Sequence, residues 1–352
     1  MDGGGPTANA DEVAGALFAL SESGTGTRPR RGRRPVASYV LTVAVLVVIN
    51  FFLPRAMPGD PIDALIDPGT PSYVQNDELR AELSAYYGLD RPLGEQFVSY
   101  LSDLAAGDLG TSIRYNRPVS ELMSERLPWT ILLIAVAVVA AAAVGMAAGV
   151  HSGWHRGRPV DRRLLGVFLG LRNVPVFFLA SIALFLFAVK LGWVPLSGAR
   201  TPFADFDNPL TTVADVAHHL VLPGAVMATR FVADDYLYMR AGMVGELGAG
   251  YLLLGRAKGL RERRLKYRYA GRNGLLPLVS AVAVQPGQAV TAAIFVETVF
   301  AYPGIGRLVF DAVSFRDYPT LQACFLVLSL VVVTANLAAD VAYRRLDPRI
   351  QP

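Results

Sequence analysis

Long apolar runs alternate with polar segments along this 352-residue chain. The first run begins near Tyr39 and ends at Phe51-Phe52-Leu53-Pro54. Each run holds about 20 residues, and an α-helix of that length crosses about 30 Å of hydrocarbon. The pattern predicts an all-α membrane protein with six transmembrane helices, the first over 36–54. The other five are expected at about 129–150, 164–190, 220–243, 275–300 and 320–342.

Charged residues gather between these runs, and the sign of the charge alternates from one segment to the next. Residues 54–128 hold six Arg against twelve Asp and Glu, whereas 151–163 hold four Arg and one Asp. Residues 244–274 hold eight Lys and Arg against two Glu, and 1–35 hold five Arg. Because Lys and Arg accumulate on cytoplasmic loops, we expect both termini to be cytoplasmic and 54–128 to be extracytoplasmic.

The extracytoplasmic segment is too long to be a bare connection. Its apolar positions between Glu78 and Leu104 recur at helical spacing and predict one or two amphipathic helices, forming a small cap. The chain is therefore expected to have five parts. They are a disordered basic cytoplasmic leader (1–35), the first transmembrane helix (36–54), the cap (55–128), a five-helix core (129–343) that contains the cytoplasmic loop 244–274, and a cytoplasmic tail (344–352).

Composition excludes several classes of protein. Apolar residues make up 53% of the chain and charged residues only 18%, whereas soluble chains carry about a quarter charged residues. A soluble enzyme, a DNA-binding module and a disordered scaffold are therefore excluded. The net charge of +4 reports orientation in the membrane, and we expect no nucleic acid partner.

Little in the sequence suggests catalysis or a bound cofactor. None of the three lysines is followed by Ser or Thr, so the chain has no phosphate loop and is not expected to hydrolyse ATP. The single cysteine, Cys324, lies in an apolar run and is interpreted as an apolar filler. His151 and His155 have helical spacing but lack the H-E-x-x-H pattern, so we expect no metal site.

The loop 244–274 is unusual among membrane loops. From Tyr251 onward, apolar residues alternate with Arg and Lys at helical spacing, and Gly259 interrupts the pattern once. Glycine suits a turn with positive φ, so the pattern predicts helix, sharp turn, helix. One interpretation is an interfacial amphipathic helix on anionic lipid headgroups. The other is a docking element for a cytoplasmic partner.

This loop resembles the cytoplasmic "EAA" loop of ATP-binding-cassette importer permeases, and most closely that of the dipeptide/oligopeptide branch. Gly255 and Gly274 stand where that pattern has alanines, and Gly250 stands where it often has Asp. The matching residues are Tyr251, Arg256, Ala257, Lys258, Gly259, Leu260, Arg272, Asn273, Leu275 and Pro277.

The resemblance extends over about 36–350, nearly the whole chain without its leader. Three groups of motifs occur in the order that the family shows. They are Pro58–Pro61, Gly88–Leu93 and Gly107–Gly110 in the cap; Glu297–Phe300, Tyr302–Gly304 and Arg316–Pro319 before the last run; and Asn336, Asp340, Tyr343 and Leu346–Ile350 at the end.

The family resemblance implies a permease in the bacterial cytoplasmic (inner) membrane that binds no cofactor itself. Its implied partners are a second permease subunit, two cytoplasmic ATPases that hold ATP and Mg, an extracytoplasmic solute-binding protein and the lipid bilayer. The short helix 248–260 would move with the ATPases and couple their closure to transport. The residues implied in coupling are Tyr251, Arg256, Ala257, Lys258, Gly259 and Leu260.

The resemblance implies di- or oligopeptides as substrate, with nickel complexes or glutathione as alternatives in the same family. A stand-alone secondary transporter is the alternative from a different class. It would be expected to show internal repeats, and no convincing repeat is found. A membrane anchor or sensor would leave the basic loop unexplained.

The fourth run carries three charged residues at membrane depth: Arg230, Asp234 and Asp235. Charges at that depth usually face a bundle interior or a water-filled path. Arg230 and Asp234 have the i, i+4 spacing of an internal ion pair. The alternative is that Asp234 or Asp235 lines the translocation path and meets a substrate amine.

Two prolines and one acidic residue within or near the apolar runs lead to further predictions. Pro175 and Pro286 fall inside the third and fifth runs, where each frees a backbone carbonyl and favours a kink. Glu297 lies near the outer end of the fifth run. It is interpreted as an interfacial acid, with contact to the binding protein as the alternative.

Overall fold

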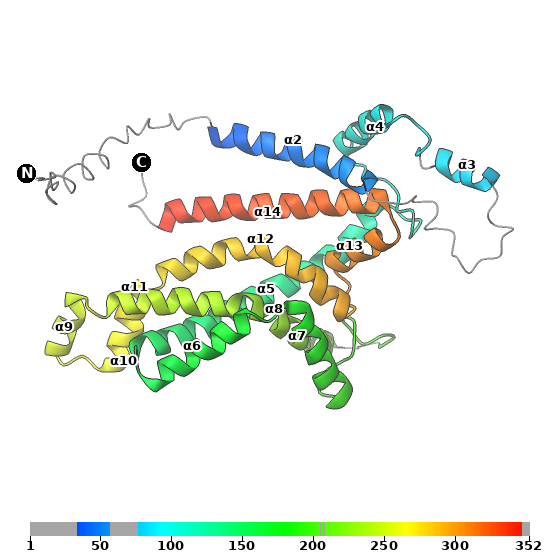
Figure 1. Ribbon diagram of the computed structural model, residues 1–352. Coiled ribbons are helices and arrows are strands. Elements are labelled where there is room, and N and C mark those ends of the chain that lie inside the picture. Colours follow the sequence, from blue (N-terminus) through cyan, green and yellow to red (C-terminus); the bar gives the residue numbers. More distant parts are fainter. Residues whose placement is uncertain (1–33, 57–76, 87, 205, 207, 347–352) are drawn as a thin grey trace, which may run out of the picture. The chain divides into compact units, whose positions relative to one another are not determined.

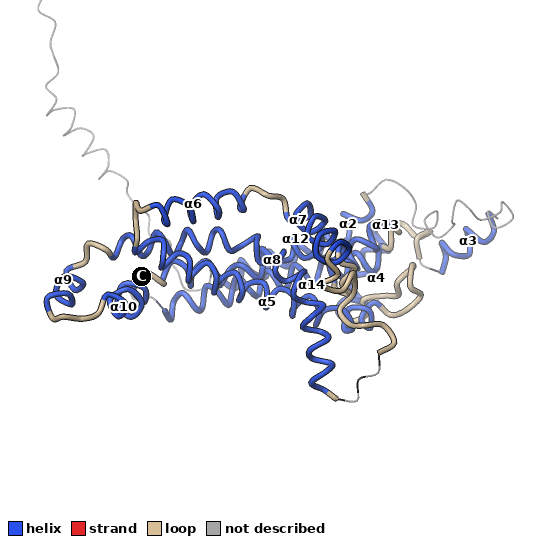
Figure 2. The backbone as a smooth tube through the Cα atoms, turned by 90° about the horizontal axis from the view of Figure 1, so that it is seen from below, coloured by secondary structure: helices blue, strands red, loops and turns tan. Residues whose placement is uncertain are grey.

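The computed structural model describes residues 34–56, 77–86, 88–204, 206 and 208–346. In this part of the chain every regular element is a helix (Figure 2), apart from an isolated bridge between Thr111 and Pro118. The predicted all-α class is therefore confirmed for the described residues. Most of the predicted leader, residues 57–76 of the cap and the tail beyond 346 lie outside them.

Two units divide the chain at residue 44, and the described part of the first unit is only the start of helix α2. Helix α2 (Arg34–Arg55) contains the first predicted span, and the predicted cap contains α3 (Asp77–Tyr86) and α4 (Leu93–Ala105), so two helices form where one or two were predicted. The rest of the chain (Figure 1) contains α5 (Val119–Trp154), α6 (Pro159–Arg172), α7 (Val176–Ala183), α8 (Pro209–Glu246), α9 (Gly250–Ala257), α10 (Glu262–Arg264), α11 (Gly271–Asn273), α12 (Leu276–Val299), α13 (Ile305–Ser314) and α14 (Tyr318–Leu346).

Four helices, α5, α8, α12 and α14, are long and apolar enough to cross a membrane. They contain the runs predicted at 129–150, 220–243, 275–300 and 320–342, although α5 and α8 begin earlier than those runs. At the start of α8 the Asn208 side chain accepts a hydrogen bond from the Leu210 amide at 2.9 Å, and Pro209 occupies the first helical position. Such caps set where a helix begins, independently of where its apolar run begins.

The span predicted at 164–190 is broken by a sharp bend. The chain forms α6 and α7 with a bend of 98° between them, as the kink expected at Pro175 predicts, and a π-helical segment, Leu184–Lys190, follows α7. Pro175 ends the first helix because it lacks an amide proton and disfavours helical backbone at the preceding residue. The apolar part of α2, Tyr39–Arg55, is shorter than the four long helices. The described residues thus hold four candidate spans, or five if the bent pair counts as one.

Helices α5 and α8 form the closest helix pair of the described chain. Three glycines at four-residue spacing on α5, Gly145, Gly149 and Gly153, permit this approach. A Cβ added at Gly149 would lie 2.6 Å from Met239 Cβ, so any larger side chain would push the helices apart. Small residues in such a pattern let helix backbones meet in membranes.

Helix α5 has 36 residues and is therefore about 54 Å long. At its N-terminal end Leu122 packs with Leu308 of α13 and with Cys324 of α14. Cys324 is fully buried there, as the apolar-filler interpretation expects. At its C-terminal end Val150 packs in one cluster with Leu252 and other side chains from the 244–274 loop. We call these the α13 end and the α9 end, and Figure 1 shows them at opposite ends of α5.

Candidate functional site

Helix α9, the predicted coupling helix, is anchored by one apolar face. Leu252 is fully buried and clusters with Met243 of α8 and with Leu265. A Cβ added at Gly255 would lie 2.6 Å from Leu265 Cδ2. The glycine found where the family pattern has alanine therefore allows Leu265 to pack directly against the helix.

The opposite face of α9 is open and carries both apolar and basic side chains. Leu253 is 71% exposed and Leu254 56% exposed. Arg256 and Lys258 are exposed beyond them. Exposed leucines beside unburied cations form a surface that a protein partner with an apolar and acidic groove would cover.

Gly259 ends the helix in a left-handed turn with φ of +72°. The Leu260 amide donates to the Gly255 carbonyl at 3.0 Å, and the Gly259 amide donates to the Arg256 carbonyl at 2.9 Å. This pair of bonds is the Schellman motif, which places glycine at the left-handed position. Nothing lies within 4 Å of an added Cβ, so within this chain the backbone conformation is what favours glycine. The predicted helix, turn, helix arrangement is confirmed.

Two side-chain contacts hold the loop in shape. The Tyr251 hydroxyl donates to the Glu246 carboxylate, which ties the start of α9 to the end of α8. Burial raises the pKa of the Tyr251 hydroxyl, and the bond to Glu246 raises it further, so the group stays protonated. Across the Gly259 turn, Arg256 Nε donates to Glu262 Oε1 at 3.0 Å, with both side chains exposed.

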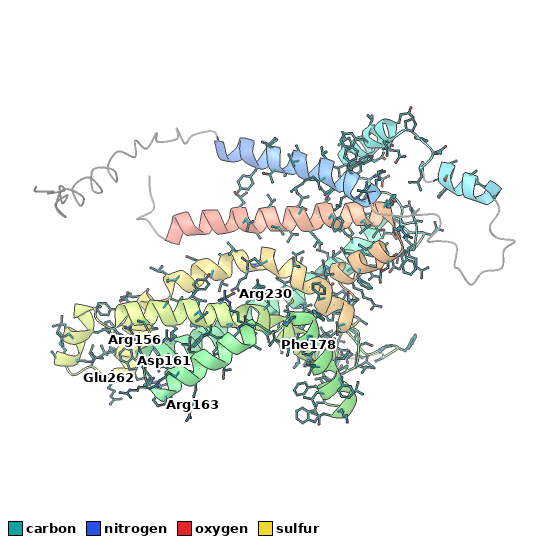
Figure 3. All side chains as sticks on the ribbon, viewed as in Figure 1. Arg156, Asp161, Arg163, Phe178, Arg230 and Glu262 are labelled. Carbon is teal, nitrogen blue, oxygen red and sulfur yellow. The ribbon has the colours of Figure 1, made fainter. Side chains whose placement is uncertain are left out.

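At membrane depth, Asp234 lies between two arginines. Its carboxylate is 3.0 Å from Arg172 Nε and 3.6 Å from Arg230, which Figure 3 labels midway along α8. The i, i+4 pair with Arg230 is present, whereas Arg172 could not be found from spacing because α6 meets α8 only in the tertiary structure. Asp234 thus links the end of α6 to α8.

Asp235 is fully buried. Gln285 Nε2 of α12 donates to Asp235 Oδ1 at 2.5 Å. The other oxygen of each side chain, Asp235 Oδ2 and Gln285 Oε1, has no hydrogen-bond partner among the described residues. Gly145 of α5 leaves the space that Asp235 occupies. Asp235 and Asp234 are therefore adjacent in sequence and differ sharply in environment.

A polar network missed from the sequence lies at the α9 end. Arg240 of α8 donates two hydrogen bonds to Asp161, at 2.7 and 2.8 Å, and Asp161 is only 2% exposed. The Ser152 hydroxyl donates to the same carboxylate at 2.5 Å, and the Gly157 amide donates at 2.8 Å. The network joins α5, α6 and α8 through Asp161, which Figure 3 labels. Its one sequence signal was a lone acid in the first turn of a helix that begins with proline.

Glu297 was interpreted as an interfacial acid, and that interpretation is wrong. The side chain is fully buried at the α13 end, where Thr130 Oγ1 donates to Glu297 Oε1 at 2.7 Å. The Arg307 amide donates to Glu297 Oε2 at 3.1 Å. The turn after α12 folds back over the carboxylate, and a Cβ at Gly304 would lie 2.2 Å from it. Glu297 therefore holds the α12–α13 turn on α5.

Comparison with known proteins gives a consistent result. The family described as "Binding-protein-dependent transport system inner membrane component" matches residues 141–352. A protein of Brucella suis biovar 1 (strain 1330) is 37% identical over 308 residues, which cover 87% of this chain and 94% of that protein. The oligopeptide transport system permease protein AppB of Bacillus subtilis (strain 168) is 34% identical, over 91% of this chain and 98% of AppB. The dipeptide transport system permease protein DppB of Escherichia coli (strain K12) is 31% identical, over 90% of this chain and 97% of DppB.

Proposed function

This chain belongs to the family of binding-protein-dependent transport system inner membrane components, and on that premise we propose that it is the permease subunit of an ATP-driven importer of short peptides. Relatives named for oligopeptide and dipeptide transport support the substrate class. The importer would also contain a second permease subunit, two ATPases that hold ATP and Mg, and an extracytoplasmic binding protein. The alternation of charge between the apolar runs supports six spans with both termini in the cytoplasm.

One observation carries the coupling role: one face of α9 is buried against the rest of the chain, and the opposite face is open. Leu252 fixes the helix to the cluster that contains Met243 of α8, while Leu253, Arg256 and Lys258 stay exposed. A force applied by an ATPase to the open face would pass through the buried base into α8. Since α8 packs along α5, both long helices would respond together.

The coupling helix can be tested through its turn. In Gly259→Asp, the left-handed turn is less favourable than with glycine, although aspartate adopts it more readily than most residues with a Cβ. The new carboxylate sits beside the docking face and would repel an acidic partner surface. We expect the protein to reach the membrane in normal amount while peptide uptake falls at least tenfold. Uptake of a labelled dipeptide by cells, with membrane abundance measured on immunoblots, reads both quantities.

Gly245→Asp is the matched control, because it places the same charge in the loop 244–274 but outside the helix 248–260. Gly245 has no positive φ, and nothing lies within 4 Å of an added Cβ. Gly259→Asn isolates the effect of the charge, since asparagine and aspartate both tolerate the left-handed conformation. Uptake at the wild-type rate in Gly259→Asp would contradict the coupling role.

The partner set separates the importer from a secondary transporter. A tagged full chain purified from its own membranes should retain one second permease subunit and two ATPase subunits. A secondary transporter would be purified without either, and its uptake would collapse with the ion gradient while ATP remained.

For the pathway, we propose that Asp234, Asp235 and Arg230 lie near the route of the substrate, a role that rests on their depth in α8.

A further inference from the structure

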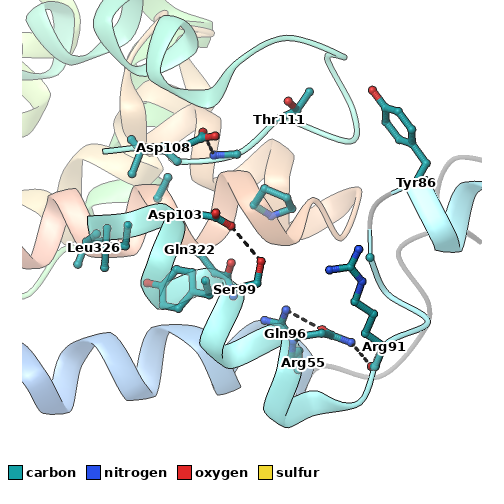
Figure 4. A pocket seen from close by; sticks show the side chains of 17 residues that line it. Arg55, Tyr86, Arg91, Gln96, Ser99, Asp103, Asp108, Thr111, Gln322 and Leu326 are labelled. Atoms are coloured by element: carbon teal, nitrogen blue, oxygen red, sulfur yellow. Dashed lines mark hydrogen bonds between the residues drawn. The ribbon is translucent and has the colours of Figure 1, made fainter. Parts of the chain in front are cut away.

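A cavity of about 330 Å³ lies in the cap region, between α4, the residues that follow it and the start of α14. Arg91, Tyr100, Asp103, Asp108 and Gln322 are among the residues that line it (Figure 4). We call it the cap cavity. It is remote from α9, because its α14 wall belongs to the α13 end.

The cap cavity contains polar groups that nothing in the described chain satisfies. Gln322 is only 8% exposed, and its Nε2 has no hydrogen-bond partner. The buried Tyr100 hydroxyl has none either. Buried polar groups are almost always paired, because an unpaired one loses its hydrogen bonds to water without replacing them. Two such groups in one cavity point to a ligand with polar atoms of its own.

Charges of both signs face the same space. The Arg91 guanidinium extends into it from the turn before α4, and within the described chain it has no ion pair. Among the described residues, the Asp103 carboxylate accepts only from Ser99 Oγ, at 3.3 Å, and the Asp108 carboxylate only from the Gly110 amide, at 2.8 Å. In Figure 4 Arg91 lies on one side of the cavity, with Asp103 and Asp108 on the other. Lining groups of both signs suit a ligand with a negative and a positive end.

Size narrows the ligand further. Small-molecule sites usually occupy about 300–1,000 Å³, so the cap cavity lies at the lower limit of that range. A compact zwitterion is favoured over a long peptide. The amide of Gln322, which has no partner among the described residues, adds a donor in the same cavity that suits a single peptide carbonyl.

We propose that the cap cavity binds a small zwitterion with one peptide bond, a dipeptide. Its carboxylate lies on Arg91, its ammonium group lies at Asp103 and Asp108, and its peptide carbonyl accepts from Gln322. The choice of a peptide rests on the proposed function, whereas the zwitterion chemistry rests on the cavity alone. This site would hold a dipeptide on the permease itself, separately from any external binding protein.

The test is direct binding of dialanine to the full chain in lipid nanodiscs, by isothermal titration calorimetry. Saturable binding is expected in the wild-type chain. Arg91→Gln and Gln322→Leu should each weaken it about tenfold, as loss of one hydrogen bond to a charged or buried group does. N-acetyl-dialanine and dialanine amide, which each lack one charge, should bind more weakly by a similar factor.

Arg117→Gln is the matched control, because Arg117 pairs with Glu121 and Glu125 outside the cavity and should not affect binding. Thermal unfolding of each variant shows that it is folded, and Arg91→Gln changes only an exposed side chain. Absence of saturable dialanine binding, or equal binding by wild type and Arg91→Gln, would overturn the proposal.

Dialanine uptake by cells separates this proposal from the proposed function. Uptake without binding in the nanodisc overturns the cap site and leaves the importer intact. Binding of free alanine without dialanine uptake supports the zwitterion site and overturns the peptide importer.

Discussion

Two arginine–carboxylate pairs near the α9 end have the same chemistry and opposite settings. Asp161 and Arg240 meet through two hydrogen bonds, with the Asp161 side chain only 3% exposed. Glu262 and Arg256 meet through one, with the Glu262 side chain 61% exposed. The first pair is completed by Ser152 and by the Gly157 amide. The second stands on the open face of the coupling loop.

The difference in burial between the two pairs indicates different roles, one in holding helices together and one at a surface that a partner could contact. A buried pair with all its hydrogen bonds made fixes α5, α6 and α8 to one another, and no partner is needed to complete it. An exposed pair contributes little to the free energy of folding. Its arginine remains able to pair with a carboxylate of a partner protein instead. The loop is thus built on a closed polar base with an open basic surface above it.

Removing the buried acid should have the largest effect. In Asp161→Ala, Arg240 loses its partner inside the protein, and breaking a buried ion pair in this way costs about 3–5 kcal/mol. Glu262→Ala is the control and should cost about 0–1 kcal/mol. Chemical unfolding of the two variants in mild detergent measures the difference. Equal losses of stability would show that the closed and open pairs do not differ as described.

A smaller effect is expected where α5 meets α8. Gly149→Val places side-chain atoms where Met239 already lies, and overpacking of this kind costs about 1–3 kcal/mol. Gly166→Val is the control, because nothing lies within 4 Å of an added Cβ at Gly166 in α6. Thermal unfolding should show a lower midpoint only for the first variant. A normal midpoint in Gly149→Val would mean that the helices separate easily and do not move as one body.

The smallest effect on folding is expected at Asp235. In Asp235→Asn the new amide can accept from Gln285 Nε2 and donate to Gln285 Oε1, which has no partner now. Stability should stay equal to wild type or rise by about 1 kcal/mol. Uptake of a zwitterionic peptide should fall, since the proposed pathway role needs the negative charge. Unchanged uptake at normal abundance would remove Asp235 from the pathway.

Local signals in the sequence explain which predictions succeeded. Gly259 predicts a turn because glycine adopts a left-handed conformation without strain. The structure places it in a Schellman motif. Pro175 was expected to disturb its run, since proline acts on its own neighbours. Both effects reach only a few residues along the chain. The size of the disturbance at Pro175, a 98° bend, depends on what α6 and α7 pack against.

Predictions that needed long-range contacts failed or could not be made. Asp161 and Arg240 are 79 residues apart, and Thr130 and Glu297 are 167 apart. The position of Glu297 at the end of an apolar run therefore predicts an interfacial acid, whereas the turn after α12 buries it. The sequence equally could not predict that Arg172 pairs with Asp234. Nor could it predict that the amide of Gln322 lies in the cap cavity without a partner among the described residues.

The sequence by itself determined the helical class, four of the apolar spans, the helical nature of the predicted cap and the helix-turn-helix form of the loop 244–274. These follow from hydrophobic period, proline and glycine, whose effects are local. The tertiary structure alone decided which charges are buried and paired and which stay open. Burial depends on residues far away in the chain, because only packing of α5, α6, α8 and α12 removes water from a carboxylate and supplies its donors.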